Sequence, residues 1–169
     1  MSTAGSAAKL KRGVGNPLID PSGVEVGSID VSCKFEHEGK ESEGAVSLAQ
    51  PKLESLVKPD EVVVRDGKVR CLFRYPLSKP FVATLRAPDG AGNFTRTALV
   101  QAICVEYARI YTEEEAKSTV PVDITSPTNL KRNKTNGPYG IWGHGLGDLH
   151  LSNIFYVDEH DALVLGIDS

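Results

Sequence analysis

Three side chains near the end of the chain, Asp148, Asn153 and Asp168, have the types and spacing that metal-assisted chemistry uses. They lie in the stretches GDLHLSN and GIDS, and Asn153 follows Asp148 by five residues. Transfer of a phosphoryl group needs side chains of this kind, because the protein's work in that reaction is to position the reactants and to neutralise charge around Mg²⁺. The three residues therefore define a candidate catalytic site.

The segment GDLHLSN…GIDS resembles the catalytic loop of the aminoglycoside phosphotransferase and choline kinase families. The resemblance implies that Asp148 would take the proton of a substrate hydroxyl, while Asn153 and Asp168 would hold metal ions. Outside these positions the chain departs from the families. Leu146 stands where they carry a histidine, and GVGNPL at 13–18 is not a phosphate-covering glycine-rich loop between strands. We therefore interpret the segment as a β-hairpin that begins at Asp148, and we keep a Mg-dependent phosphotransferase as the alternative function.

No other set of residues predicts a metal or cofactor site. His144, Asp148 and His150 are spaced i, i+4, i+6, which fits no strong template for metal ligands. The cysteines are far apart and form no CxxC pair, so we expect reduced core thiols rather than a disulfide framework or a zinc site; they are Cys33, Cys71 and Cys104. We predict no cofactor.

A glycine-rich and aromatic stretch, NKTNGPYGIWGH, precedes the predicted hairpin at residues 133–144. Its glycines allow the backbone to turn tightly or to approach another group closely. Trp142 in such a loop acts either as a packed lid or as a platform for a ligand. We predict that Tyr139, Trp142 and His144 contribute to an interaction surface.

This stretch and the residues beside it are similar to a motif of the form N-R-N-x-T-x-G-x-Y-G-I-W-G-H-D-x-x-D-L. The motif belongs to uncharacterised proteins of giant DNA viruses and of some protists and algae. The resemblance extends to the helix before it, through an F-T-R…Y…I-Y-x-E-E pattern that begins at Phe94, and Gly145 departs from it where an acidic residue is expected. The resemblance implies that six residues of the motif form one structural unit; they are Gly137, Tyr139, Gly140, Trp142, His144 and Asp148.

One long amphipathic helix is predicted over about residues 95–116, with Thr95 as its N-cap. At 100° per residue, its large apolar side chains fall on one arc of the helix, which indicates packing against a sheet; they are Leu99, Val100, Ile103, Cys104, Tyr107, Ile110 and Tyr111. The run of glutamates at 113–115 is unfavourable near a helix C-terminus. We therefore expect solvated glutamates, and a possible second start of the helix at Thr112.

Alternating apolar and polar residues predict strands on both sides of the helix. A first strand is expected over 29–35, and Asp66-Gly67 predicts a tight hairpin turn between two β-rich runs. A further strand is expected over 81–85. After the helix, two strands form a C-terminal β-hairpin. Leu149, Leu151, Phe155 and Val157 are expected on one face of its first strand, and His150, Ser152, Ile154 and Tyr156 on the other. The order of elements favours an α+β fold with a mainly antiparallel sheet.

The chain is predicted to form one domain, residues 24–169, after an N-terminal arm at 1–23. The arm is small, punctuated by glycine and proline and mildly basic through Lys9, Lys11 and Arg12. A formal net charge of −3 excludes a chain-wide basic field, so nucleic acid is not an expected partner, although Lys131, Arg132 and Lys134 form a small basic cluster. No apolar run has the length of about 20 residues that crosses a bilayer, and the N-terminus lacks the apolar block of a signal peptide.

These observations predict a non-enzymatic structural or interaction module. The viral resemblance makes a virion or capsid-associated component of a large DNA virus the concrete form of that hypothesis. Protein partners, or further copies of the chain, are expected to bind through the N-terminal arm. The predicted location is the cytoplasm or the virion, not the secreted fraction.

Overall fold

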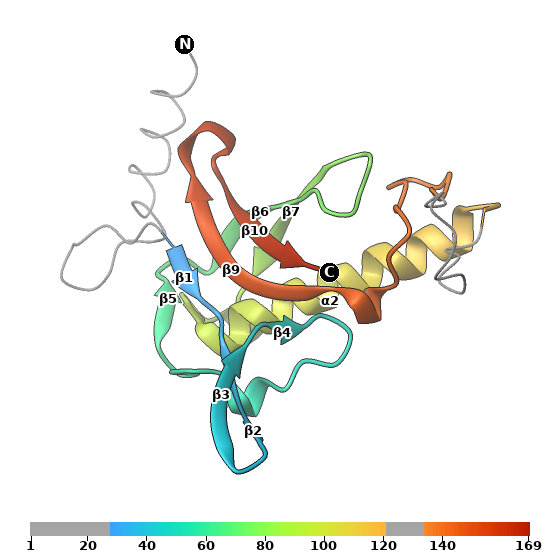
Figure 1. Ribbon diagram of the computed structural model, residues 1–169. Coiled ribbons are helices and arrows are strands. Elements are labelled where there is room, and N and C mark those ends of the chain that lie inside the picture. The colour runs from blue at the N-terminus through green and yellow to red at the C-terminus, as the bar shows by residue number, and fades with distance from the viewer. Residues whose placement is uncertain (1–27, 121–133) are drawn as a thin grey trace.

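A six-stranded sheet backs one long helix in the computed structural model, which describes residues 28–120 and 134–169 (Figure 1). The strands are ordered β1-β9-β10-β6-β7, and β4 pairs with another part of β9. All neighbours are antiparallel except β10 and β6, which are parallel. The bounds are β1 Ser28–Asp30, β4 Val46–Ser47, β6 Lys68–Phe73, β7 Phe81–Arg86, β9 His150–Val157 and β10 Ala162–Asp168.

The helix, α2, spans Arg96–Lys117 and runs across one face of this sheet (Figure 1). Thr95 caps it as predicted, because its hydroxyl accepts a hydrogen bond from the Ala98 N–H at 3.1 Å. All of the apolar side chains assigned to the inner arc are buried. The helix does not restart at Thr112, whose hydroxyl donates to the Ala108 carbonyl within one continuous helix. The predicted α+β class is confirmed.

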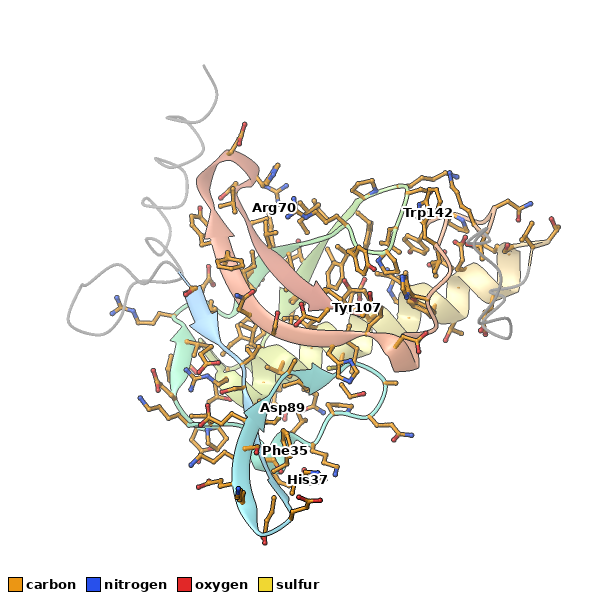
Figure 2. All side chains as sticks on the ribbon, in the orientation of Figure 1. Phe35, His37, Arg70, Asp89, Tyr107 and Trp142 are labelled. Atoms are coloured by element: carbon orange, nitrogen blue, oxygen red, sulfur yellow. The ribbon has the colours of Figure 1, made fainter. Side chains whose placement is uncertain are left out.

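The core lies between α2 and the sheet. Tyr107 sits at its centre without exposed surface, edge-on to the ring of Phe73 at 5.1 Å between centroids (Figure 2). Its hydroxyl donates to the Tyr75 carbonyl at 2.8 Å, so the polar end of this large side chain is also satisfied. This bond ties the middle of α2 to the segment that leaves β6.

Smaller elements surround this core. The pair β2 Cys33–His37 and β3 Lys40–Gly44 forms a hairpin, and β5 Val62–Val64 pairs with β8 Phe94–Thr95. The described residues also contain four short 3-10 helices: η1 Leu53–Ser55, η2 Pro88–Gly90, η3 Leu146–Asp148 and η4 Asp158–His160.

The strand predicted over 29–35 is divided into two. β1 joins the main sheet, whereas β2 turns away into its own hairpin with β3. The turn between them is held by Asp30, whose carboxylate accepts hydrogen bonds from the backbone N–H and the hydroxyl of Ser32. Ile29 and Cys33 are buried as expected, but Phe35 is 49% exposed because the β2–β3 hairpin extends beyond the main sheet (Figure 2).

The hairpin predicted at Asp66-Gly67 is wrong. The two runs that flank this dipeptide do not pair with each other: β5 pairs with β8, while β6 pairs with β7 and β10. Asp66 still shapes a turn by accepting from the Lys68 N–H, and the Gly67 carbonyl accepts from the Ala87 N–H at 2.8 Å. Long-range partners therefore prevail over the local turn signal.

The C-terminal hairpin of β9 and β10 is confirmed, but it begins at His150 and not at Asp148, which ends η3, and the prediction that Leu151 and Phe155 share a face is wrong. The register shifts between Gly166 and Ile167, which leaves Ser152 as an extra residue in β9. An extra residue exchanges the two faces of a strand beyond it. Leu151 and Ile154 therefore both face the core and are buried, whereas Phe155 is 39% exposed.

Candidate functional site

A buried glutamate organises the glycine-rich and aromatic loop. Glu114, in the last turn of α2, has no exposed surface, and its carboxylate faces the loop at 135–141. One oxygen, Oε1, accepts from the Thr135 hydroxyl at 2.5 Å and from the N–H groups of Gly137 and Gly140 at 2.9 and 3.0 Å. The other, Oε2, accepts from the Tyr139 N–H at 2.8 Å. The loop is therefore wrapped around a single carboxylate.

Two glycines are required for this arrangement. A Cβ atom on Gly137 would lie 2.6 Å from the carboxyl carbon of Glu114, so no larger residue fits there without a shift. Gly140 has a φ of +62°, and a Cβ on it would meet the Ser78 hydroxyl. Two hydrogen bonds join the ends of the loop. The Thr135 N–H donates to the Ile141 carbonyl at 2.9 Å, and the Ile141 N–H donates to the Thr135 hydroxyl at 2.6 Å.

The environment of Glu114 favours its charged form. Burial raises the pKa of this carboxyl, but the hydrogen bonds from Thr135 and from the three backbone N–H groups lower it, and the net shift is downward. The expectation that the glutamate run is solvated is thus wrong for Glu114. Its sequence position gave no sign of burial, because every donor to it lies later in the chain.

The neighbouring Glu113 holds the side chain of Tyr139. Its carboxylate accepts from the Tyr139 hydroxyl at 2.8 Å and also bonds to Arg109 and Lys117 at 2.7 and 2.6 Å. Hydrogen bonds from Lys117 and Tyr139 lower the pKa of Glu113 to about 2. Tyr139 is 7% exposed and packs edge-on to Phe81. Its role in the structure is to pin the loop rather than to present a free ring.

Trp142 is placed differently from Tyr139. Its side chain is 43% exposed, although its backbone is fixed by a hydrogen bond from its N–H to the Pro76 carbonyl at 3.0 Å. The ammonium of Lys134 lies 5.7 Å from the centre of the indole ring, within the range of a cation–π contact. Figure 2 shows Trp142 on the loop beside the C-terminal half of α2.

A half-open pocket of about 300 Å³ lies next to Trp142. Its wall on the other side is the segment that leaves β6, and the lining residues are Arg74, Tyr75, Pro76, Leu77, Trp142 and His144. The Tyr75 hydroxyl is hydrogen-bonded to His144 Nε2 at 3.1 Å and to the Ser169 hydroxyl at 2.8 Å. The His144 carbonyl accepts from the Tyr111 hydroxyl, so α2 also supports this side of the loop.

The side chains of the three residues in the kinase-like pattern form no hydrogen bond or ion pair with one another. Asp148 ends η3, and its Oδ2 accepts from the Gly145 N–H at 2.9 Å. Asn153 lies in β9 opposite Gly166, with its side chain against that glycine, and Asp168 lies in β10 opposite His150. Within the described ranges, no three side chains of histidine, cysteine, aspartate or glutamate are grouped so that they would hold a metal ion.

The cysteines are free and buried. Burial raises the pKa of the Cys71 thiol, and it raises that of Cys104 to about 12. Both thiols are therefore protonated at neutral pH and are poor nucleophiles.

The structure brings together three of the residues predicted for interaction, since Tyr139, Trp142 and His144 all lie on the loop that Glu114 holds. The other three, Lys9, Lys11 and Arg12, lie outside the described residues, as do Lys131 and Arg132. No local pattern pointed to Arg74 and Tyr75, which face the loop only because β6 ends beside it.

No family model, curated protein or solved structure matches the chain. In the part of the chain that the structure describes, α2 and the shorter helices all lack the length and apolar character needed to span a membrane.

Proposed function

We propose that this protein is a non-enzymatic interaction module that binds a protein partner at the Trp142 pocket. The observation that carries the proposal is the contrast between a fixed backbone and an exposed ring. Four hydrogen bonds to Glu114 hold the loop, and the loop leaves Trp142 43% exposed beside Arg74 and Tyr75. Tryptophan, tyrosine and arginine are the residues that most often carry the binding energy of protein interfaces.

The fixed loop supports this function energetically. A partner that binds a mobile loop must offset the entropy of ordering it, whereas a loop held in advance avoids that cost. The carboxylate of Glu114 is itself expensive to bury, and burial is tolerated only because its oxygens are fully hydrogen-bonded. A buried charge used to hold a surface loop supports a role for that loop beyond connecting α2 to β9.

The finer form of the proposal is a virion or capsid-associated component of a large DNA virus, with the cytoplasm or the virion as its location. It rests on the sequence motif at 133–144. The basic arm, with Lys9, Lys11 and Arg12, would provide a second contact to a partner or to another copy of the chain.

Size-exclusion chromatography with light scattering tests the interaction, applied to the purified chain and to its native extract. We expect a larger species in the extract that is lost with Trp142→Ala. The matched control is Phe35→Ala, since Phe35 is an aromatic side chain of similar exposure on the distant β2–β3 hairpin. If Trp142→Ala retains the larger species, the pocket is not the interface.

Deletion of residues 1–22 tests the arm in the same experiment. We expect the larger species to weaken or disappear. An unchanged assembly and unchanged partner retention would contradict the role proposed for Lys9, Lys11 and Arg12.

A thermal shift with Mg-ATP separates this proposal from the phosphotransferase alternative. A ligand that binds only the folded state raises the melting temperature. We expect no shift at millimolar Mg-ATP. A shift that Asp148→Asn removes, together with nucleotide turnover, would instead support the site at Asp148, Asn153 and Asp168.

A further inference from the structure

We propose that the Trp142 pocket recognises a peptide segment in which an apolar side chain is flanked by carboxylates. This inference rests on the function proposed above and specifies the chemistry of the partner. The apolar side chain enters the pocket, and a neighbouring carboxylate pairs with Arg74.

The charge of the pocket supports an acidic partner. Arg74 is exposed and makes no ion pair with any carboxylate of the described residues, and the pocket lining contains no acidic side chain. Lys134 adds a second exposed cation over the indole of Trp142. This positive rim stands out on a chain whose net charge is −3. A guanidinium that is free at the edge of an apolar pocket is well suited to a carboxylate, which it can hold through two parallel hydrogen bonds.

The size and lining of the pocket support a single apolar side chain. Pro76 and Leu77 are buried and supply aliphatic walls, while Trp142 and Tyr75 supply rings. A volume of about 300 Å³ is at the lower end of the range for small-molecule sites. It accommodates one anchoring side chain better than a whole cofactor.

The backbone around the pocket favours recognition through side chains. The Trp142 N–H is bonded to the Pro76 carbonyl, and the Leu77 N–H is bonded to the Arg74 carbonyl at 2.9 Å. These groups are not available to pair with an added strand. Selectivity would therefore come from the pocket and from Arg74.

The same features argue against a nucleotide. Sites for phosphate chains gather several N–H donors in a nest or at a helix N-terminus. Here the lining offers one guanidinium, and the backbone N–H groups of Trp142 and Leu77 are already used.

Titration of tryptophan fluorescence tests the proposal directly, because Trp142 is the only tryptophan in the chain. The probes are four blocked tripeptides: acetyl-Glu-Phe-Glu-amide, acetyl-Gln-Phe-Gln-amide, acetyl-Glu-Ala-Glu-amide and acetyl-Lys-Phe-Lys-amide. We expect the first to give a saturable change in emission at millimolar concentration. The other three should bind about tenfold more weakly, since each lacks either the charge or the apolar anchor.

Two variants separate Arg74 from general charge effects. Arg74→Gln should weaken binding of Glu-Phe-Glu about tenfold and leave Gln-Phe-Gln unchanged. Arg86→Gln is the matched control, because Arg86 is also exposed and forms no ion pair with the described carboxylates, but lies on β7 outside the pocket lining. Both arginines are exposed, so melting temperatures close to that of the wild type should confirm that each variant folds.

Equal binding of the Glu and Gln peptides would overturn the proposal, as would the absence of any response at millimolar peptide. Tighter binding of adenosine monophosphate than of any peptide, if lost with Arg74→Gln, would also overturn it and assign the pocket to a nucleotide. These results are independent of the assembly experiment. If Trp142→Ala abolishes the native assembly while the peptides show no preference, only the acidic specificity fails; if the assembly survives that substitution, the proposed function fails.

Discussion

The two ends of α2 each carry a buried ionic side chain, and the two are used in opposite ways. At the start, Arg96 is 7% exposed and donates to backbone carbonyls: Nε to Asp30 at 2.8 Å, and Nη1 to Lys58 and Val57 at 2.6 and 3.2 Å. At the end, Glu114 accepts from backbone N–H groups. One end collects carbonyl oxygens around a cation, and the other collects N–H groups around an anion.

Neither charge is placed to stabilise the helix itself. The positive end of the helix dipole is its N-terminus, which favours acidic side chains, and the negative end favours basic ones. Arg96 and Glu114 have the opposite arrangement. Their hydrogen bonds go to neighbouring segments instead, so each charge stabilises the position of loops against α2.

The segments that they hold differ in kind. Arg96 connects the end of β1 with residues 57–61, which are distant in sequence and lead into β5. Glu114 holds one short loop, and that loop carries Trp142 and half of the pocket. The same device therefore joins segments of the fold at one end of the helix and holds the loop of the proposed binding surface at the other.

The largest expected effect is that of Glu114→Ala. It leaves the Thr135 hydroxyl and three backbone N–H groups without their acceptor, so we expect a loss of about 3–5 kcal/mol in the free energy of unfolding, measured by urea denaturation. Trp142 emission in the folded protein should also change. Glu115→Ala is the control, because Glu115 is exposed in the same turn of α2. A loss below about 1 kcal/mol would contradict the anchoring role.

Arg96→Met should cost about 2–3 kcal/mol, because the carbonyls of Asp30, Val57 and Lys58 lose a charged donor. In contrast to Glu114→Ala, the Trp142 emission of the folded variant should match that of the wild type. Arg65→Met, at an exposed position, is the control. A shifted Trp142 emission in Arg96→Met would remove the distinction between the two ends of the helix.

Gly137→Ala tests the close approach of the Gly137 backbone to Glu114, which concerns only the C-terminal end of α2. The added methyl group would lie 2.6 Å from the Glu114 carboxyl carbon, and we expect a destabilisation of about 1–3 kcal/mol from the forced shift. Gly147→Ala should be close to neutral, since a Cβ there meets no atom within 4 Å. Equal melting temperatures for the two variants would show that the loop relaxes freely.

The smallest expected effect is the loss of folding stability at low pH. Because the pKa of Glu114 is lowered from 4.5 in the folded protein, its contribution is present above pH 4.5 and is lost as the pH falls through the lowered value. The pKa of Glu113 is lowered to about 2, so Glu113 adds a loss of stability of the same sign as the pH falls from 4.5 through that value. Glu114→Gln should flatten the dependence of stability on pH below 4.5. A wild-type dependence retained in Glu114→Gln would assign the acid sensitivity to other carboxylates.

Much of the fold follows from local sequence. The apolar arc of α2, the N-cap at Thr95 and the C-terminal hairpin are predicted from residues a few positions apart, and the structure confirms them. The candidate site is predicted only in part. The motif identifies Tyr139, Trp142 and His144, but the anchor Glu114 and the facing wall at Arg74 and Tyr75 are not found.

The sequence by itself determined the helix α2 and the strands β6, β7, β9 and β10, because periodicity and capping are properties of near neighbours. The tertiary structure decided what depends on distant partners. It paired β5 with β8 instead of β6, exchanged Ile154 for Phe155 through a bulge, and buried Glu114 while its neighbour Glu115 stayed exposed. A buried carboxylate and a solvated one look alike in sequence, since only the N–H groups that a distant loop brings to it make its burial favourable.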